Sequence, residues 1–304
     1  MSIVDTLNSL DLYEIFYDET AALIFAYEAD MLYDGGICES TYGCRGNYSL
    51  SQDLTTRTGY RLRCPICGKT KSLFYNSVFT RSNIKVNTVL HLIYCWAQEL
   101  SCKYTAYECN VSRNTVTNYF QAFRQACNFY FERKHQCQIG GEGLNVEIDE
   151  TVIAKRKYNV GRIPSEVWVF GGICRETGER FAFQVPDRKA STLLPLIQEY
   201  VAPKSIIHSD CWPSYSGIDS LPEDYFHFTV NHTQNFVDPK TKSHTQNIER
   251  MWRGLKRVKR RYEGVSRKDI DDHISEYLWR KRKHVHHFNA FSKAIKLISK
   301  CSYY

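Results

Sequence analysis

The chain has 304 residues, of which 43% are hydrophobic, and it carries a formal net charge of +7 and 12 cysteines. This length accommodates about two domains, and this hydrophobic content excludes a globally disordered chain. No apolar run reaches about 18 residues, so we expect no membrane-spanning helix. The N-terminus lacks the pattern of a secretory signal, and the scattered cysteines are typical of a reducing, intracellular compartment. The positive charge favours an anionic partner, although a basic soluble enzyme would also carry it.

The first segment, residues 1–35, is predicted to be helical. Apolar residues recur there at helix-like intervals, and they include Leu10, Ile15, Phe16, Leu23, Ile24 and Met31. This pattern predicts an amphipathic segment that packs against the rest of the protein or docks a partner.

Residues 36–80 contain two pairs of cysteines on either side of a predicted strand. Cys64 and Cys67 are separated by two residues and followed by a glycine, whereas Cys38 and Cys44 are separated by five. Two tight turns that each present two thiolates are the arrangement of a zinc ribbon. We therefore predict a structural Zn²⁺ site on these four cysteines; the alternative is a pair of small loops with unligated thiols.

Residues 83–137 are predicted to form a helix-turn-helix. A first helix ends at a short turn over 109–111, and Ser112 caps a second helix. The polar side chains expected to face outward from the second helix, and so to reach base edges or phosphates, are Arg113, Asn114, Thr117 and Asn118. An ordinary helical hairpin is the alternative.

A glycine-rich break over 138–145 marks the predicted start of a mixed α/β domain that spans residues 144–285, with a C-terminal tail over 286–304. Strands are predicted at 145–154, 167–175, 180–185, 204–209 and 225–230, and helices at 192–200, 245–260 and 267–283. Strands in hairpins followed by a helix that crosses to further strands predict one mixed sheet with helices packed on it.

Three acidic residues occupy different settings in this domain. Asp149 lies within a strand whose Val146 and Ile148 point to the opposite face, Asp210 follows a second strand, and Glu249 lies early in a helix. A carboxylate within a strand is costly unless it is paired or binds a cation. In open α/β sheets, ligands bind at the carboxyl ends of strands. Clustered carboxylates are typical of a site for Mg²⁺ or Mn²⁺.

The helix after His244 combines acidic and basic groups. One face carries residues at steps of three, four and seven, namely Glu249, Trp252, Arg253 and Lys256, and the basic run continues through Lys259 and Arg260. We expect Trp252 to pack on the sheet and the basic residues to contact DNA phosphates, although Lys256 is equally compatible with a solvated lysine. Glu147 and Glu150 are further candidates for binding the metal, and the candidates for positioning water or the ions are His208, His244 and Asn247. Each of the five is equally compatible with a purely structural role.

Several motifs together resemble one family. They are the Cys-Pro-Ile-Cys-Gly knuckle, Ile148-Asp-Glu-Thr151, Val169-Phe-Gly-Gly172, Ser209-Asp210 followed by Tyr215, and His244-Thr-Gln-Asn-Ile-Glu-Arg-Met-Trp-Arg-Gly-Leu-Lys256. The region from about 64 to 283 resembles the IS1595-like (ISXO2-like) transposases and the related eukaryotic Merlin DNA transposons. Some bacterial members have asparagine as the third ligand, so Asn247 rivals Glu249 for that position.

The resemblance implies an RNase H-like catalytic domain with a DDE triad at Asp149, Asp210 and Glu249, and Lys256 as a further functional position. Two Mg²⁺ (or Mn²⁺) ions on this triad would support cleavage at transposon ends and strand transfer. The expected partners are double-stranded DNA, as terminal repeats and as target, and further copies of the chain, with no membrane. In a eukaryote, the expected location is the nucleus. The alternatives are a domesticated, catalytically silent DNA-binding protein and a nuclease without strand transfer.

Overall fold

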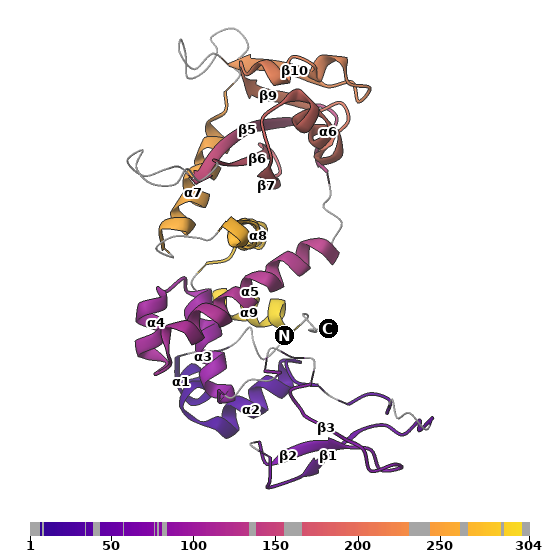
Figure 1. Ribbon diagram of the computed structural model, residues 1–304, viewed down its shortest axis with the longest axis vertical. Helices are drawn as coiled ribbons and strands as arrows, with labels where there is room; N and C mark the ends of the chain where they lie inside the picture. The colour runs from indigo at the N-terminus through magenta and orange to yellow at the C-terminus, as the bar shows by residue number, and fades with distance from the viewer. Residues whose placement is uncertain are drawn as a thin grey trace. The chain divides into compact units, whose positions relative to one another are not determined.

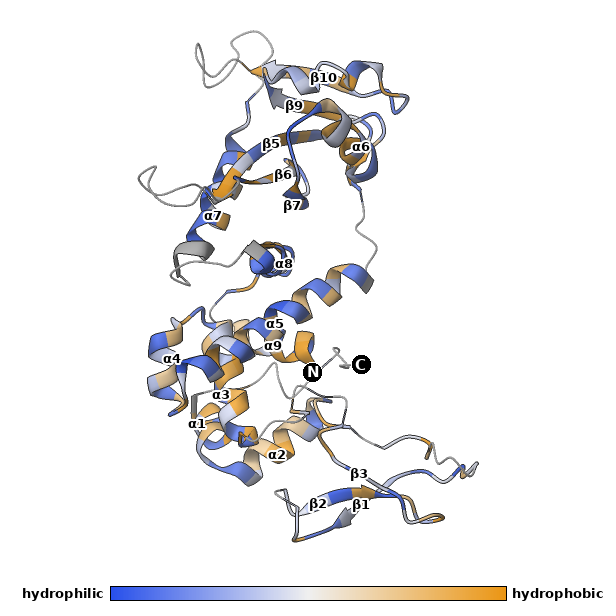
Figure 2. Ribbon diagram, viewed as in Figure 1, coloured by the Kyte–Doolittle hydropathy of each residue, from blue (hydrophilic) through white to orange (hydrophobic). Residues whose placement is uncertain are grey.

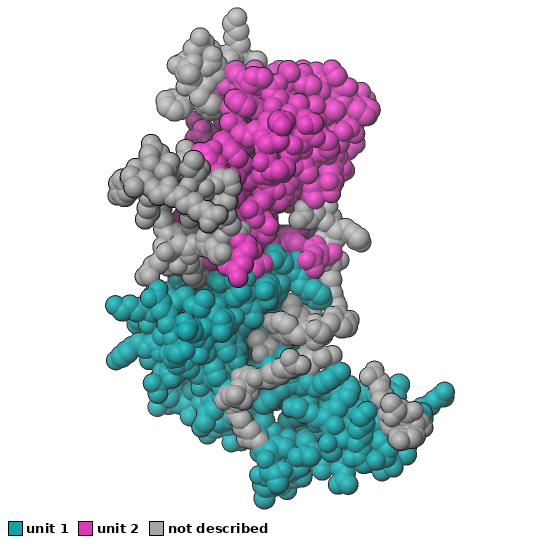
Figure 3. Space-filling model, in the orientation of Figure 1, with its two compact units in different colours: residues 1–130, 285–304 teal, residues 131–284 magenta. Residues whose placement is uncertain are grey.

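The computed structural model describes residues 7, 9–33, 35–38, 43–56, 58–75, 77, 79–80, 84–133, 138–154, 166–230, 244–261, 267–286 and 289–299. The chain divides into two compact units (Figure 3): unit 1 contains residues 1–130 and 285–304, and unit 2 contains residues 131–284. The domain boundary predicted at residue 144 therefore lies inside unit 2. Within the described ranges, no helix is both long and apolar enough to cross a membrane.

Unit 1 has a helical core that the two ends of the chain build together. Its helices α1 (Ser9–Tyr17), α2 (Glu19–Glu28) and α3 (Val86–Ala97) pack with α9 (Ala290–Ile298). Phe291 of α9 stacks on Phe25 with ring centroids 6.1 Å apart and meets Phe16 edge-on at 6.0 Å. Figure 2 shows hydrophobic residues along α2 and α9. The predicted C-terminal tail thus contains a core helix.

The cysteine-rich segment of unit 1 forms a small antiparallel sheet of β1 (Ser49–Gln52), β2 (Tyr60–Arg63) and β3 (Thr70–Lys71). Its small core consists of Tyr48, Leu62 and Leu73 together with Cys38 and Cys64. So few apolar residues give a sheet of this size little stability, and small domains of this kind usually depend on metal or disulfide cross-links.

Helices α4 (Cys102–Glu108) and α5 (Arg113–Arg133) follow α3. Helix α4 ends in a Schellman motif: Asn110 adopts a φ of 49° and donates to Tyr107, while Val111 N donates to Ala106 O at 3.0 Å. Ser112 Oγ then accepts from Thr115 N at 3.1 Å and caps α5, as predicted. The two predicted helices and the short turn between them are present, an arrangement that fits both a helix-turn-helix and an ordinary helical hairpin.

Unit 2 is built on one mixed sheet of five strands with the order β10-β9-β5-β6-β7 (Figure 1). The strands are β5 (Asn145–Ala154), β6 (Val167–Cys174), β7 (Arg180–Val185), β9 (Ile206–Asp210) and β10 (Phe226–Val230). β5, β6 and β7 are antiparallel neighbours, and β9 and β10 run parallel to β5. This topology is the RNase H-like mixed sheet, so the predicted fold class and the predicted strands are confirmed.

Two helices cover opposite faces of this sheet. Helix α6 (Ala190–Tyr200) buries Leu193 and Ile197 in a core with Val146, Ile148 and Phe170. Helix α7 (Gln246–Arg261) packs on β5 and β6 from the other side, and α8 (Ile270–Arg282) packs against α7 and β7. The face of β5 that carries Glu147 and Asp149 therefore faces α7. In the glycine-rich stretch, the two-residue strand β4 (Ile139–Gly140) pairs in parallel with β8 (Val201–Ala202), and this pair was not predicted.

Candidate functional site

Asp149 and Asp210 lie at matching positions on the neighbouring strands β5 and β9. The parallel pairing of β5 with β9 ends with Glu147 opposite His208. Asp149 and Asp210 each come two residues later on their strands, so the two carboxylates leave adjacent strands at matching positions. The strand-edge placement predicted for Asp210 holds, and it puts this acid beside the middle of β5.

Asp149 is half-buried, and its surroundings favour the protonated carboxyl. Burial is the largest cause that raises the pKa of Asp149 to about 7; the negative charges of Glu150 and Asp210 contribute to this rise, and the hydrogen bond from Trp252 opposes it. Trp252 Nε1 donates to Asp149 Oδ2 at 2.9 Å. Several acids crowded together in a poorly solvated place are held there at a cost that a cation would offset.

Glu150 points to the other face of β5 and extends this acidic region. Its Oε2 atom is buried with no hydrogen-bond partner of normal geometry, and Arg188 Nε lies 3.4 Å from Oε1. Tyr215 is 1% exposed, and burial together with the charges of Glu150 and Asp149 raises its pKa well above the usual value. The Arg188 guanidinium stacks on Trp212, with its central carbon 3.8 Å from the ring centroid.

Glu147 fastens the start of α7 to β5. Its carboxylate is fully buried and accepts from Asn247 N at 2.8 Å, Ile248 N at 3.0 Å, Asn247 Nδ2 at 2.8 Å and Arg175 Nε at 2.8 Å. Two of these donors are free N–H groups of the first helical turn, where the helix dipole favours an anion. His244 Nδ1 lies 3.2 Å away. Glu147 and Asn247 were both considered as metal ligands from the sequence, but in the structure they hydrogen-bond to each other.

Glu249 lies in the first turn of α7, two residues after Asn247, and is half-buried. Because Glu147 holds the helix start and Trp252 contacts Asp149, α7 has one fixed placement on β5. On the same helix, Arg253 is exposed and Lys256 is half-buried. Lys259 and Arg260 belong to α7, but their side chains lie outside the described residues.

A glycine makes room for the contact between Trp252 and Asp149. Gly171 of β6 pairs directly with Asp149 in the sheet. A Cβ atom on Gly171 would come within 2.7 Å of the Trp252 ring and of the Phe181 carbonyl oxygen. A side chain here would push the indole away from the sheet, so the Gly-Gly motif noted in the sequence serves the acidic site.

The donor set fits a hard divalent cation. Carboxylate oxygens are the ligands that Mg²⁺ and Mn²⁺ prefer. The raised pKa of Asp149 indicates that this carboxylate lacks a compensating positive charge, which a bound cation would supply. Among the described residues, the groups whose potential ligand atoms all lie within 4.8 Å of one another are built on cysteines. Asp149, Asp210 and Glu249 do not form such a tight group, so metal binding would draw their oxygens closer.

The pKa of Asp149 leads to a stability prediction. A carboxyl with a folded pKa of about 7 against an ordinary 3.8 destabilises the fold as pH rises from about 4 to 7. Asp149→Asn removes this penalty, so without divalent metal it should raise the free energy of unfolding by about 2 to 4 kcal/mol at pH 8. At pH 4 the difference should vanish, and urea titrations at both pH values measure it. An equal effect at both pH values would contradict the assigned pKa.

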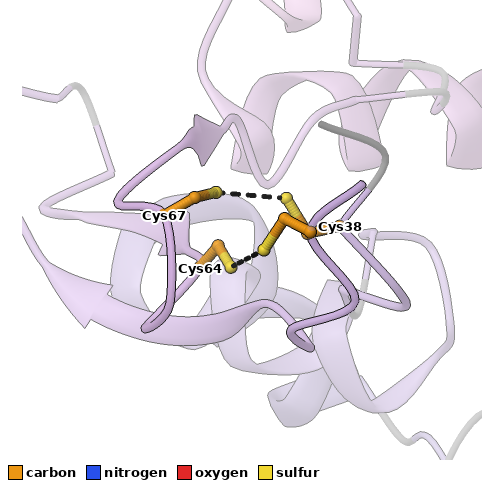
Figure 4. A group of neighbouring side chains, drawn as sticks. Cys38, Cys64 and Cys67 are labelled. Carbon is orange, nitrogen blue, oxygen red and sulfur yellow. Dashed lines mark hydrogen bonds between the residues drawn. The ribbon is translucent and has the colours of Figure 1, made fainter. Parts of the chain in front are cut away.

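The four predicted cysteines come together in unit 1 (Figure 4). Cys38 Sγ lies 3.5 Å from Cys67 Sγ, and Cys44 Sγ lies 3.6 Å from Cys64 Sγ. All four sulfurs lie within 4.8 Å of one another, although the first pair has an irregular spacing. Thiolates bound to one tetrahedral zinc at about 2.3 Å are separated by about 3.8 Å, so the four sulfurs fit this ion.

We expect zinc to be part of the folded cysteine-rich segment. The Cys64→Ser variant should lose one zinc per chain, because a serine hydroxyl does not replace a thiolate ligand. Elemental analysis after dialysis measures the loss. Cys211→Ser, which changes an exposed cysteine in unit 2, is the matched control and should keep the wild-type zinc content. Equal zinc in both variants would contradict the site.

The predicted DNA-contacting residues of the helix-turn-helix all lie on the surface. Arg113, Asn114, Thr117 and Asn118 are exposed along the first turns of α5, while Val116 and Phe120 on the opposite side are fully buried. The helix therefore presents a polar face with one cation and two amides. Such side chains can contact phosphates and base edges.

Parts of this chain resemble known proteins. Residues 139–282 match the family model of the ISXO2-like transposase domain. An uncharacterized transposase-like protein of Haemophilus influenzae is 30% identical over 96 residues, which are 32% of this chain and 75% of that protein. Among solved structures, the catalytic core domain of BIV integrase aligns at 20% identity and a TM-score of 0.31 over 45% of this chain and 81% of its own. The HTLV-2 integrase catalytic core domain in complex with magnesium aligns at 14% identity and a TM-score of 0.31, over 46% and 86%.

Proposed function

The chain belongs to the ISXO2-like transposase family, and we propose on that basis that it is a DDE-type transposase that cuts DNA at transposon ends and joins them to target DNA. One observation carries the proposal: Asp149 and Asp210 lie at matching positions on adjacent parallel strands, where burial and the charges of Glu150 and Asp210 raise the pKa of Asp149 to about 7. Glu249 on α7 completes the proposed triad.

The proposed division of labour follows from the contacts. Asp149 and Asp210 would hold divalent metal from the sheet, and Glu249 would do so from the helix. When bound, Mg²⁺ or Mn²⁺ supplies Lewis-acid activation of the reacting oxygens and neutralises phosphate charge. Trp252 orients the Asp149 carboxylate through its 2.9 Å hydrogen bond. Exposed Arg253 and half-buried Lys256 lie farther along α7, where cationic side chains would hold the DNA backbone.

Unit 1 would supply the sequence-reading part. The exposed polar face of α5 would enter a DNA groove, with Arg113 and Asn114 at the start of the helix. The cysteine-rich sheet would be a second, zinc-stabilised DNA-binding module. Both are proposals for binding the terminal repeats, and their DNA affinity should fall steeply with salt.

One gel assay tests the function. Labelled DNA carrying the inverted repeats that flank the reading frame is incubated with the full chain, Mg²⁺ and a target plasmid. We expect label joined to the plasmid. Cleaved ends without joining would indicate a nuclease, and a shifted band alone would indicate a silent DNA-binding protein; either result would overturn the proposal.

The proposed function also implies an oligomeric state and, in a eukaryote, a location. A transposase must bring two ends together, so we propose that the chain works as a homo-oligomer. The resemblance to Merlin elements would place a eukaryotic copy in the nucleus. Analytical ultracentrifugation with terminal-repeat DNA would measure the assembly.

A further inference from the structure

A second group of metal-type ligands lies within unit 1, away from the four-cysteine cluster. Its members are His91, Cys95 and Cys109, whose ligand atoms all lie within 4.8 Å of one another. Cys95 and Cys109 are buried free thiols, and His91 is partly buried. None of the three takes part in the proposed DNA chemistry.

Helical spacing explains how these side chains meet. His91 and Cys95 are four residues apart on α3, so they share one face of that helix. Cys109 directly follows α4, and the left-handed turn at Asn110 fixes its position. Two helices thus converge on one point with donors of the kinds that bind zinc.

The distances match one shared ion. Cys95 Sγ and Cys109 Sγ are 4.0 Å apart, close to the separation of about 3.8 Å expected for two thiolates on a tetrahedral zinc. A disulfide is absent, and both sulfurs are free. Cys95 also interacts with His91, so imidazole and thiol already face each other.

A buried hydroxyl lies beside this group. Thr105 lies four residues before Cys109 on α4 and is fully buried. Its hydroxyl is close enough to Cys95 to donate a hydrogen bond to that sulfur. Partners of this kind orient the ligands of a metal site.

We propose that His91, Cys95 and Cys109 form a second zinc site, with the Thr105 hydroxyl positioned to hydrogen-bond to the Cys95 sulfur. The ion would join α3 to the turn that precedes α5. Because Arg113 and Asn114 begin α5, this site would hold the exposed polar face of that helix in place. The inference does not depend on the proposed transposase activity.

The test uses the full chain and zinc alone. In the Cys64→Ser/Cys67→Ser double variant, which lacks two ligands of the four-cysteine cluster, elemental analysis should find one zinc per chain. Adding Cys95→Ser or Cys109→Ser should remove it. Adding Cys127→Ser, a buried cysteine of α5 outside the group, should leave it in place. Cobalt substitution of the double variant should give a thiolate-to-metal absorption band that the Cys95→Ser addition removes.

If the double variant does not fold, the same cysteine changes are made singly in the wild-type chain and zinc content is compared again. There, Cys95→Ser should lower zinc by one per chain relative to wild type, and Cys127→Ser should not. Circular dichroism confirms that each variant is folded. A folded double variant without zinc, or zinc content that is the same with and without Cys95 and Cys109, would overturn the second site.

Discussion

Asp149→Asn is expected to abolish Mg²⁺-dependent DNA cleavage and to leave DNA binding nearly intact. Asparagine keeps the size of the side chain and can still accept from Trp252, but it removes a charge from the place where Asp149 and Asp210 meet. Metal-based charge stabilisation contributes several kcal/mol, so the cleavage rate should fall on the order of 10³-fold or more. Single-turnover cleavage of labelled terminal-repeat DNA measures the rate, and a gel shift measures binding.

The matched control is Glu179→Gln, which neutralises an exposed acid in the turn between β6 and β7 of the same unit. Its cleavage rate should stay within about twofold of wild type, because exposed charges contribute little. If Asp149→Asn cut transposon ends at the control rate, Asp149 would have no role in the chemistry.

Glu147→Ala is expected to be the most destabilising single change in unit 2. It removes the carboxylate that pairs with Arg175 and accepts the first N–H groups of α7. Removing one partner of a buried ion pair costs about 3 to 5 kcal/mol, since the remaining charge and donors are left without partners. Urea unfolding of the full chain measures the loss.

The same variant should loosen α7 specifically. Backbone amides of Asn247 and Ile248 should exchange with deuterium at least tenfold faster, and cleavage should fall because Glu249 sits on the loosened turn. Glu142→Ala, which changes an exposed acid 4.0 Å from Lys204, should change neither stability nor exchange. Unchanged protection of α7 in Glu147→Ala would show that Glu147 does not fix this helix.

Local patterns were enough to predict the sheet of unit 2. The alternation around Val146 and Ile148 and the apolar run before Asp210 gave β5 and β9 nearly to the residue. Period and turn residues are local properties, and that is why they can be read from one sequence. The β4 and β8 pair was missed because two-residue strands carry no period. The helix in the C-terminal tail was missed although its sequence carries a local signal, since Phe291, Ala294, Ile295 and Ile298 recur at helix-like intervals.

The sequence was sufficient to predict which residues belong to the candidate site, but not all of the contacts that they make. Asp149 and Trp252 were expected on the sheet and on the helix face above it, and they meet there. The role of Glu147 depends on α7, whose start lies 100 residues away in the chain, so no local pattern encodes it. The His91 and Cys95 pair did have a local signal, a histidine and a cysteine four apart on a helix. The third residue of the group, Cys109, could not be assigned from the sequence, because only the fold of unit 1 brings it close to His91 and Cys95.

Mn²⁺ binding to the full chain tests most directly the central claim that Asp149, Asp210 and Glu249 act as one metal site. Mn²⁺ stands in for Mg²⁺ and can be counted by electron paramagnetic resonance, after the cysteines have been loaded with zinc and free zinc has been removed, because free zinc would compete with Mn²⁺ for the carboxylates. We predict that Asp149→Asn, Asp210→Asn and Glu249→Gln each weaken Mn²⁺ binding by at least tenfold, while Glu179→Gln binds as wild type does. Binding that is equal in wild type and in all three variants would contradict the account.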